Sequence, residues 1–318
     1  MLSYIRKRLL MTIPTFFGVA LLTFLMLRVM PGDVVEYKLR ADGGALVSEE
    51  TIQAEKRRLG LDKPLWAQFG DWAIGLATLD LGKSMWTDRP VVEEIGARIQ
   101  LSLQVAVMAV VFGVAIAVPL GTLSALHRGT FIDQFIRVIT ITGIAMPPFW
   151  TGMLLLLSLL AVFQWLPPLS FTPIYKDPVA NISQLMWPAM AIGYRLAALV
   201  TRVIRSSLLE VLNEDYIRTA RAKGVYERVV IRRHALRNAL LPAVTVVGVE
   251  FGLLVGGLVV TEQVFNLNGI GRLFVEAVAR SDFMLIQGLV LTTAAFFIVV
   301  NLVVDVLYAL LDPRIQLH

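Results

Sequence analysis

The chain has 318 residues, of which 57% are hydrophobic and 17% are charged, and its mean hydropathy is +0.71. This composition is typical of a polytopic membrane protein and excludes an ordinary soluble globule. The net charge of +5 is small, and the absence of cysteine excludes disulfides, thiolate metal sites and cysteine nucleophiles.

Six apolar stretches are long enough to cross ~30 Å of hydrocarbon as helices at about 1.5 Å per residue. They predict an all-α protein with six transmembrane helices at 9–30, 101–126, 135–163, 185–205, 242–262 and 284–311. The first is interpreted as a retained span, because "RVMPGD" follows it where a signal peptide would have a small-residue cleavage site. We divide the chain into a tail with the first helix (1–30), a long loop with short helices (31–100) and a five-helix core (101–318) containing a loop at 206–241.

Lysine and arginine are unevenly distributed between the two sides of this arrangement. With the N-terminus inside, the inner segments hold fifteen of them and the short outer loops hold three. This is the positive-inside bias of membrane proteins, for which the loop at 31–100 is too long to count. Both termini and the loop at 206–241 are therefore expected in the cytoplasm.

The long outer loop is expected to contain two helices. Ser48 can cap the first, which has acidic residues in its first turn, basic residues in its last turn and Gly60 after its end. The second starts after a proline and carries Trp66, Phe69 and Trp72 at three-residue spacing. Its aromatic face either lies at the membrane interface or packs against the first loop helix.

The stretch "ATLDLGKS" (77–84) fits a relaxed phosphate-binding loop, with Ala77 at the position of the first glycine. Such a loop needs a buried strand before it and a helix directly after it. Neither pattern is present, and the topology places the stretch outside the cell. We interpret it as a turn between loop helices.

Two features within the predicted spans indicate special packing. Pro147 and Pro148 lie near the middle of the third span and free backbone carbonyls, which favours either a simple kink or a kink beside a translocation path. In the fifth span Gly248, Gly252 and Gly256 form a stripe of small residues that lets another helix approach closely. The sequence leaves open whether that helix belongs to this chain or to a partner.

Arg195 in the fourth span and Glu250 in the fifth are the deepest charged residues of the predicted bundle. Their depths differ by roughly one helical turn, a gap that a long arginine side chain can cover. Because buried charges in membranes are costly, they usually pair or line a polar path. We expect either a static pair or two residues that line a pathway.

No catalytic or metal-binding pattern is present in the sequence. HExxH does not occur, and no serine within a span has a histidine at comparable depth to act as its base. An intramembrane enzyme is therefore a remote alternative. A secondary carrier is another, but it would be expected to show internal repeats and several intramembrane acids, of which Glu250 is the only deep one.

The loop at 206–241 continues the fourth span into a helix that ends at Gly224, where glycine suits a left-handed turn. A basic helix follows, and its spacing predicts one apolar face: Val229, Val230, Ala235 and Leu236. The two helices predict a protruding elbow. It either docks into a groove of a soluble partner or anchors to anionic lipid.

The elbow sequence resembles the cytoplasmic EAA loop of permease subunits of bacterial ABC importers, in the dipeptide, oligopeptide and nickel branch. The shared form is close to "YIRTARAKG…HALRNALLP", and further matches cover nearly the whole chain: "RVMPGD", "LGLDKPLWAQFGDW", "DLGKS", "MPPFW" and "LLDPRI". The general pattern has Glu-Ala-Ala just ahead of the glycine, where this chain has Arg218, Thr219 and Ala220. Its Leu-Pro also lies further downstream, and both departures look typical of the peptide branch.

The resemblance implies an ABC importer permease fold with an EAA-type coupling loop, in a non-catalytic, multi-pass subunit of the bacterial inner membrane. The implied partners are a second homologous permease, two cytoplasmic ATPase subunits that hold ATP and Mg, a periplasmic solute-binding protein and the lipid bilayer, without nucleic acid. This chain would hold no cofactor itself. The solute would be a di- or oligopeptide, although similar permeases carry nickel, opines, glutathione or oligosaccharides.

The same resemblance assigns a coupling helix to about 212–224, seated in a groove of an ATPase subunit. The residues assigned to it are Asp215, Tyr216, Ile217, Arg218, Thr219, Ala220, Arg221, Ala222, Lys223 and Gly224.

Overall fold

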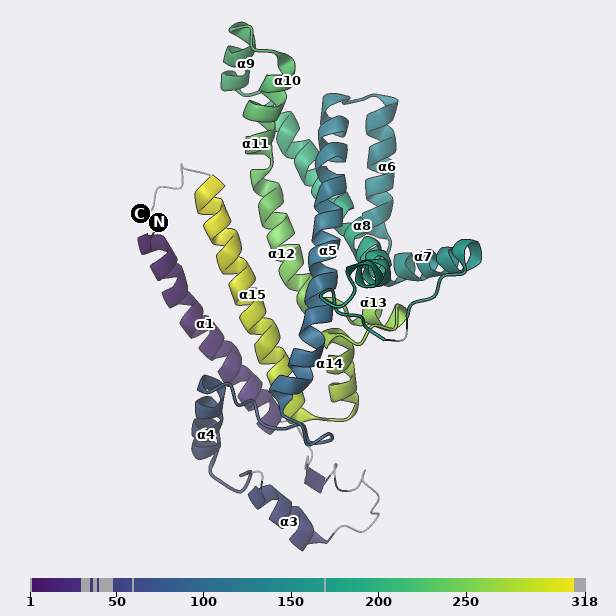
Figure 1. Ribbon diagram of the computed structural model, residues 1–318. Coiled ribbons are helices and arrows are strands. Elements are labelled where there is room, and N and C mark those ends of the chain that lie inside the picture. The colour runs from purple at the N-terminus through teal and green to yellow at the C-terminus, as the bar shows by residue number, and fades with distance from the viewer. Residues whose placement is uncertain are drawn as a thin grey trace.

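The computed structural model describes residues 2–29, 35–36, 39, 48–58, 60–168 and 170–311. The prediction of an all-α protein is confirmed, since the only β contact within these ranges is a single antiparallel bridge between Lys83 and Pro90. With the labels of Figure 1, the helices are α1 (Leu2–Val29), α3 (Glu49–Arg58), α4 (Leu65–Ala77), α5 (Val91–Leu126), α6 (Phe131–Ala145), α7 (Pro148–Phe163), α8 (Pro178–Val211), α9 (Asp215–Ala222), α10 (Glu227–Val229), η1 (Val230–Ala235), α11 (Leu236–Ala239), α12 (Leu241–Gly257), α13 (Val259–Val264), α14 (Ile270–Ala279) and α15 (Phe283–Leu311).

Two helices are long and apolar enough to cross a membrane alone, at Val91–Leu126 and Phe283–Val306. Two bent pairs pass the same test when each is taken as one span: α6 with α7, and the helix at 227–239 with α12. By length and composition the described residues therefore give two to four candidate spans. The count of six stays a prediction.

The body of the molecule is the pair α5 and α8, which run parallel and pack along most of their length. Glycines bring the two helices close together. A Cβ atom on Gly121 would lie 2.8 Å from Cβ of Ile204, and one on Gly193 would lie 2.7 Å from the carbonyl oxygen of Ala109. Because neither site leaves room for a side chain, packing dictates glycine at both.

A sharp corner replaces the continuous third span expected at 135–163. Helix α6 ends at Ala145, α7 starts at Pro148, and the helix direction changes by 107°. Pro147 and Pro148 have no backbone N–H, and proline pushes the preceding residue to an extended conformation. Met146 and Pro147 are accordingly extended, with ψ of 129° and 138°. As a result α7 projects sideways from the bundle instead of continuing along it (Figure 1).

The two helices expected in the long loop are present as α3 and α4. The hydroxyl oxygen of Ser48 accepts a hydrogen bond from the backbone N–H of Thr51 at 3.3 Å, as expected of a cap. Gly60 has φ +69°, the left-handed conformation expected after the end of the first helix. Pro64 directly precedes α4. The predictions for these two helices are confirmed.

The aromatic face of α4 packs on a partner that neither sequence-based alternative named. The rings of Phe69 and Trp72 lie 5.3 and 5.5 Å from the ring of Phe24 in α1. Trp66 is 78% exposed. The loop helix is thereby held to α1 through two of its three aromatic residues.

The stretch at 77–84 is a turn, as expected. Leu79 and Gly82 both have positive φ, and the element before the turn is α4 instead of a strand.

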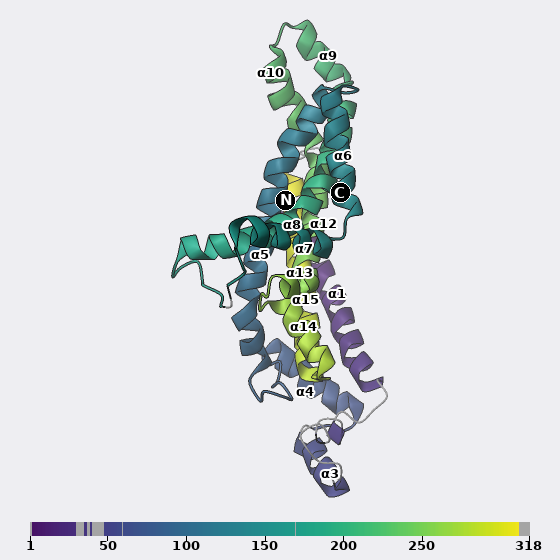
Figure 2. The ribbon, with the colours of Figure 1, turned by 90° about the vertical axis from the view of Figure 1, so that its right-hand side faces the viewer.

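At one end of the bundle, α9 and α10 extend beyond the ends of α5 and α6 in both views (Figures 1 and 2). The beginning of α1 and the end of α15 point toward this same end (Figure 1). We call residues 212–239 the elbow. It connects α8 directly to α12, so any displacement of the elbow is passed to two helices of the bundle.

Candidate functional site

The elbow rests on the bundle through one small apolar cluster. Ile217 is the only buried residue of α9 and has no exposed surface. It packs with Leu208 of α8 and with Val230, Ala235 and Ala239 of the return segment. The remaining assigned residues of α9 surround this anchor and are exposed, apart from the half-buried Ala220.

A left-handed glycine ends α9. Gly224 has φ +75°, and no atom would lie within 4 Å of a Cβ there. The N–H of Val225 donates to the carbonyl of Ala220, and the N–H of Gly224 donates to that of Arg221, which together form a Schellman motif. The prediction of a left-handed turn is confirmed. Backbone conformation, not space, is what dictates glycine at this position.

Two ion pairs brace the elbow, one of them across that turn. Arg221 donates from Nε and Nη2 to both carboxylate oxygens of Glu227, at 3.1 and 2.7 Å. These hydrogen bonds to Glu227 raise the pKa of Arg221. Asp215 accepts from Arg218 at 3.4 Å. A set of exposed basic residues remains outside these pairs: Lys223, Arg228, Arg232, Arg233 and Arg237.

The return segment differs from the predicted regular helix. Its middle part is a π-helix, η1, and the inward residues are Val230, Ala235 and Ala239. Val229, expected on the same face, is 40% exposed. Of the other three residues predicted on that face, Val230 and Ala235 are buried and Leu236 is half-buried. π-helical turns often occur at functional sites.

Arg195 and Glu250 contact each other within the bundle. Nη1 of Arg195 lies 3.2 Å from Oε2 of Glu250, which joins α8 to α12. The Glu250 side chain is 14% exposed, whereas that of Arg195 is 43% exposed. The pair is therefore half open, and the arginine has donors available to a further group.

The glycine stripe of α12 faces α15 of the same chain. A Cβ on Gly252 would lie 2.7 Å from the ring of Phe297, and one on Gly248 would overlap Val304. Gly256 lies in α12, one turn beyond Gly252. Within the described residues, the stripe serves packing inside this chain.

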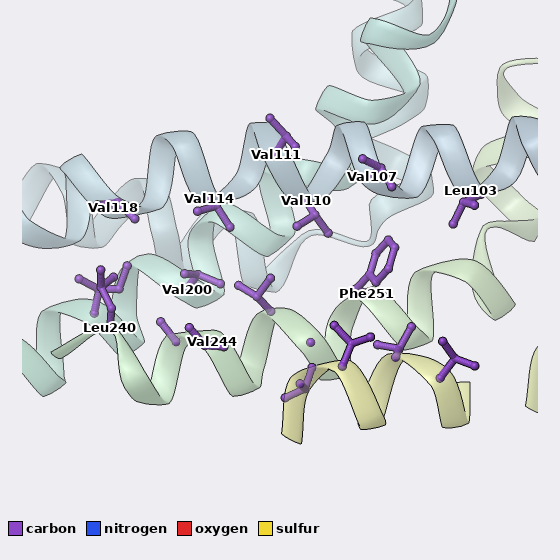
Figure 3. A pocket seen from close by; sticks show the side chains of 18 of the residues that line it. Leu103, Val107, Val110, Val111, Val114, Val118, Val200, Leu240, Val244 and Phe251 are labelled. Atoms are coloured by element: carbon purple, nitrogen blue, oxygen red, sulfur yellow. The ribbon is translucent and has the colours of Figure 1, made fainter. Parts of the chain in front are cut away.

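An apolar groove of about 580 Å³ lies between α5, α12 and α15. Valines of α5 form one wall, and Phe251 closes part of the space from α12 (Figure 3). The lining is almost entirely hydrocarbon, so the groove offers no chemistry beyond apolar packing.

Sequence reasoning missed the buried carboxylates, and three of them bind groups in distant segments of the chain. Asp133 of α6 pairs with Arg205 of α8 at 2.8 Å. Glu262 of α13 accepts from Ser102 of α5 at 2.7 Å. Asp282, just before α15, is also buried. Their acidic character was visible in the sequence, but each partner lies far along the chain, so no local pattern pointed to the contact.

At the end of the bundle opposite the elbow, buried carboxylates tie distant segments together. Asp282 accepts from the Ser84 hydroxyl at 2.5 Å and from the backbone N–H groups of Met85 and Leu285, both at 3.2 Å. We call this Asp282 network, together with the Glu262–Ser102 contact, the clamp. It holds the loop before α5 and the segment before α15 in fixed register.

No group of three or more potential metal ligands occurs among the described residues. The geometry thus offers a bundle with a protruding elbow, a clamp and a half-open ion pair. Nothing in these features resembles the nucleophile and base of a hydrolase.

Comparisons with known proteins cover the whole chain. The family described as binding-protein-dependent transport system inner membrane component matches residues 117–317, and the N-terminal region of such membrane components matches residues 1–106. The dipeptide transport system permease protein DppB of Escherichia coli K12 is 39% identical over 340 residues, covering 99% of each chain. The glutathione transport system permease protein GsiC of Escherichia coli O6:H1 (strain CFT073) is 39% identical over 316 residues, with the same coverage.

Proposed function

Because the chain belongs to the family of binding-protein-dependent transport system inner membrane components, we propose that it forms half of the membrane pathway of an importer for di- or oligopeptides. It is a non-catalytic permease subunit of an ABC importer, in the inner membrane. The peptide class is supported by the names of the full-length relatives, one for dipeptides and one for glutathione, itself a tripeptide. Glutathione is the second candidate, because the two relatives are equally similar.

The observation that carries the proposed mechanism is the elbow. It protrudes beyond the bundle, and it connects α8 to α12 through a helix of two turns. We propose that α9 and Gly224 sit in the groove of an ATPase subunit, which holds ATP and Mg. Movement of the ATPase then displaces α8 and α12 together, and the half-open pair of Arg195 and Glu250 faces the pathway.

Two apolar surfaces of the chain support the proposal that a second permease subunit packs against it. The groove between α5, α12 and α15 and the sideways helix α7 are both apolar and open to the outside of this chain. Apolar patches of this size on one subunit mark sites that another protein or lipid covers. A homologous permease would supply matching apolar helices, and the binding protein would approach from the clamp end.

The solute is tested by uptake. The chain, its second permease, both ATPase subunits and the binding protein are reconstituted into vesicles, and uptake of a dipeptide, a longer peptide and glutathione is followed with ATP. ATP-dependent uptake of peptides, with peptide bound to the purified binding protein by mass spectrometry, is the expected result. Uptake of nickel or an oligosaccharide in place of every peptide would contradict the peptide class but not the permease role.

The proposed orientation puts the elbow and both termini in the cytoplasm. The chain has no cysteine, so single cysteines can be placed without background. Cysteine at Gly129 or Val225 should react only with reagents that reach the cytoplasm, and cysteine at Asp177 or Asn268 should react from outside. Labelling at Val225 from outside would invert the arrangement and remove the elbow from the ATPases.

A further inference from the structure

A polar pocket of about 490 Å³ lies at the base of the elbow, between the α5–α6 turn and the end of α8. Three arginines and two acids contribute to its lining: Arg128, Arg137, Arg205, Asp133 and Glu210. It is separate from the assigned coupling residues of α9, none of which lines it.

Both carboxylate oxygens of Asp133 accept hydrogen bonds from groups within the protein. Its two carboxylate oxygens accept from Nε and Nη2 of Arg205, both at 2.8 Å, from the Ser124 hydroxyl at 2.6 Å and from the Gly129 N–H at 3.0 Å. The pair of Asp133 and Arg205 is therefore neutral and serves to join α6 to α8. It leaves the carboxylate with no capacity to neutralise the other arginines.

Arg128 and Arg137 carry the remaining positive charge. Both are exposed, and neither has an ion-pair partner among the described residues. Glu210 is the only other acid of the lining, so the pocket retains a net positive charge after the inner pair is discounted. Two unpaired guanidinium groups beside a concave surface favour a ligand with a phosphate group, which accepts several hydrogen bonds at once.

An apolar stripe runs down α6 from the edge of this pocket. Phe131, Phe135, Val138 and Ile141 are between 54% and 79% exposed, at helical spacings of three and four residues. The first two rings stack with a centroid separation of 6.3 Å. At about 100° per residue, Arg137 lies between this stripe and the buried face that carries Asp133. The basic pocket and the apolar stripe are therefore continuous.

We propose that this pocket binds the phosphate of an anionic phospholipid of the cytoplasmic leaflet, with the acyl chains lying along the exposed stripe of α6. Arg128 and Arg137 bind the phosphate, while the Asp133–Arg205 pair fixes the pocket floor. The leaflet assignment rests on the membrane orientation proposed above. A free phosphate would use the same arginines but gain nothing from the stripe, which is why the observations favour lipid.

The test measures lipid bound to the intact complex by native mass spectrometry, after exchange into phosphatidylcholine with added phosphatidylglycerol or added inorganic phosphate. Arg128→Gln and Arg137→Gln should each lower phosphatidylglycerol occupancy by about fivefold, the effect of one basic residue near an anionic membrane surface. Arg232→Gln with Arg233→Gln is the matched control, because these exposed elbow arginines lie outside the pocket. Phe131→Ser with Phe135→Ser should also reduce lipid binding, without affecting phosphate.

An equal loss in the elbow control would indicate general attraction of basic residues to the membrane and would overturn the pocket. So would loss of the ATPase subunits from the Arg128→Gln complex with unchanged lipid, which would assign the arginines to a protein contact. The pocket could instead bind inorganic phosphate as well as it binds phosphatidylglycerol, with no effect of the two phenylalanine changes. That result would overturn the assignment of a lipid as the ligand. None of these measurements depends on transport, so a failed peptide assignment would leave the result interpretable.

Discussion

The clamp and the elbow are held in opposite ways. In the clamp, buried carboxylates bind groups far along the chain: Ser84 and Asp282 are 198 positions apart, and Ser102 and Glu262 are 160 positions apart. In the elbow, the side-chain ion pairs are exposed and join residues no more than six apart. Its one firm contact with the bundle is the apolar cluster around Ile217.

This difference indicates where movement can enter the molecule. Exposed ion pairs contribute little to stability, whereas breaking a buried hydrogen-bonded carboxylate leaves several donors unpaired. The clamp therefore keeps its helices in register at the proposed periplasmic end. The elbow can be displaced as a unit at the other end, turning about its small anchor.

The largest effect is expected at the clamp. Asp282→Ala should lower the free energy of unfolding by about 3 kcal/mol, because the Ser84 hydroxyl and two backbone N–H groups lose their acceptor. Thermal unfolding of the purified protein measures it. Asp80→Ala is the control: Asp80 accepts one hydrogen bond from Gly82 but is exposed, so little should change. Equal losses in both variants would remove the distinction between clamp and surface.

A somewhat smaller effect is expected in the body that joins the two ends. Gly121→Ala forces a methyl group to within 2.9 Å of the Thr201 carbonyl oxygen, and overpacking should cost about 2 kcal/mol. Gly96→Ala on the same helix meets no atom within 4 Å and should stabilise the protein by up to ~1 kcal/mol. Opposite signs in thermal unfolding are expected; the same sign for both would contradict close packing of α5 on α8.

The half-open pair should show a smaller coupling. Removing Arg195 or Glu250 alone leaves a charge without its partner. The losses of unfolding free energy in the two single alanine variants should therefore add up to more than the loss in the double variant. The coupling energy should be about 1 kcal/mol, since 43% of the Arg195 side chain is exposed and solvent screens the contact. A double-mutant cycle on unfolding measures it. Strictly additive losses would show that the contact carries no energy.

Local features of the structure could be predicted from the sequence. The left-handed turn at Gly224, the cap at Ser48 and the break near Pro147 each depend on a residue type and its immediate neighbours. The angle of the corner could not be predicted, because a proline pair fixes where a helix ends but leaves the direction of the next helix to packing.

The features that could not be predicted depend on contacts between distant segments or on a local change of helical register. The contact of Asp133 with Arg205 needs α6 and α8 to be folded against each other before either side chain has a partner. The π-helical segment of the elbow also escaped prediction, because its sequence has no breaker to mark the extra residue. The Arg195–Glu250 contact could be predicted only from the general rule that charged side chains buried in a membrane usually form pairs.

The central claim is that the elbow couples ATP hydrolysis to transport, and Gly224 tests it most directly. Gly224→Val strains the left-handed turn by roughly 1 kcal/mol or more, while Gly224→Asn keeps a residue that tolerates this conformation. Nothing lies within 4 Å of a Cβ there, so the two variants differ in backbone preference without a clash.

The measurement is the ratio of solute taken up to ATP hydrolysed, in reconstituted complexes with equal subunit content. Gly224→Val should lower this ratio severalfold while membrane insertion and the Gly224→Asn ratio stay normal. A normal ratio in Gly224→Val would contradict the coupling role, and the basic elbow would then be better explained as an anchor to the membrane surface.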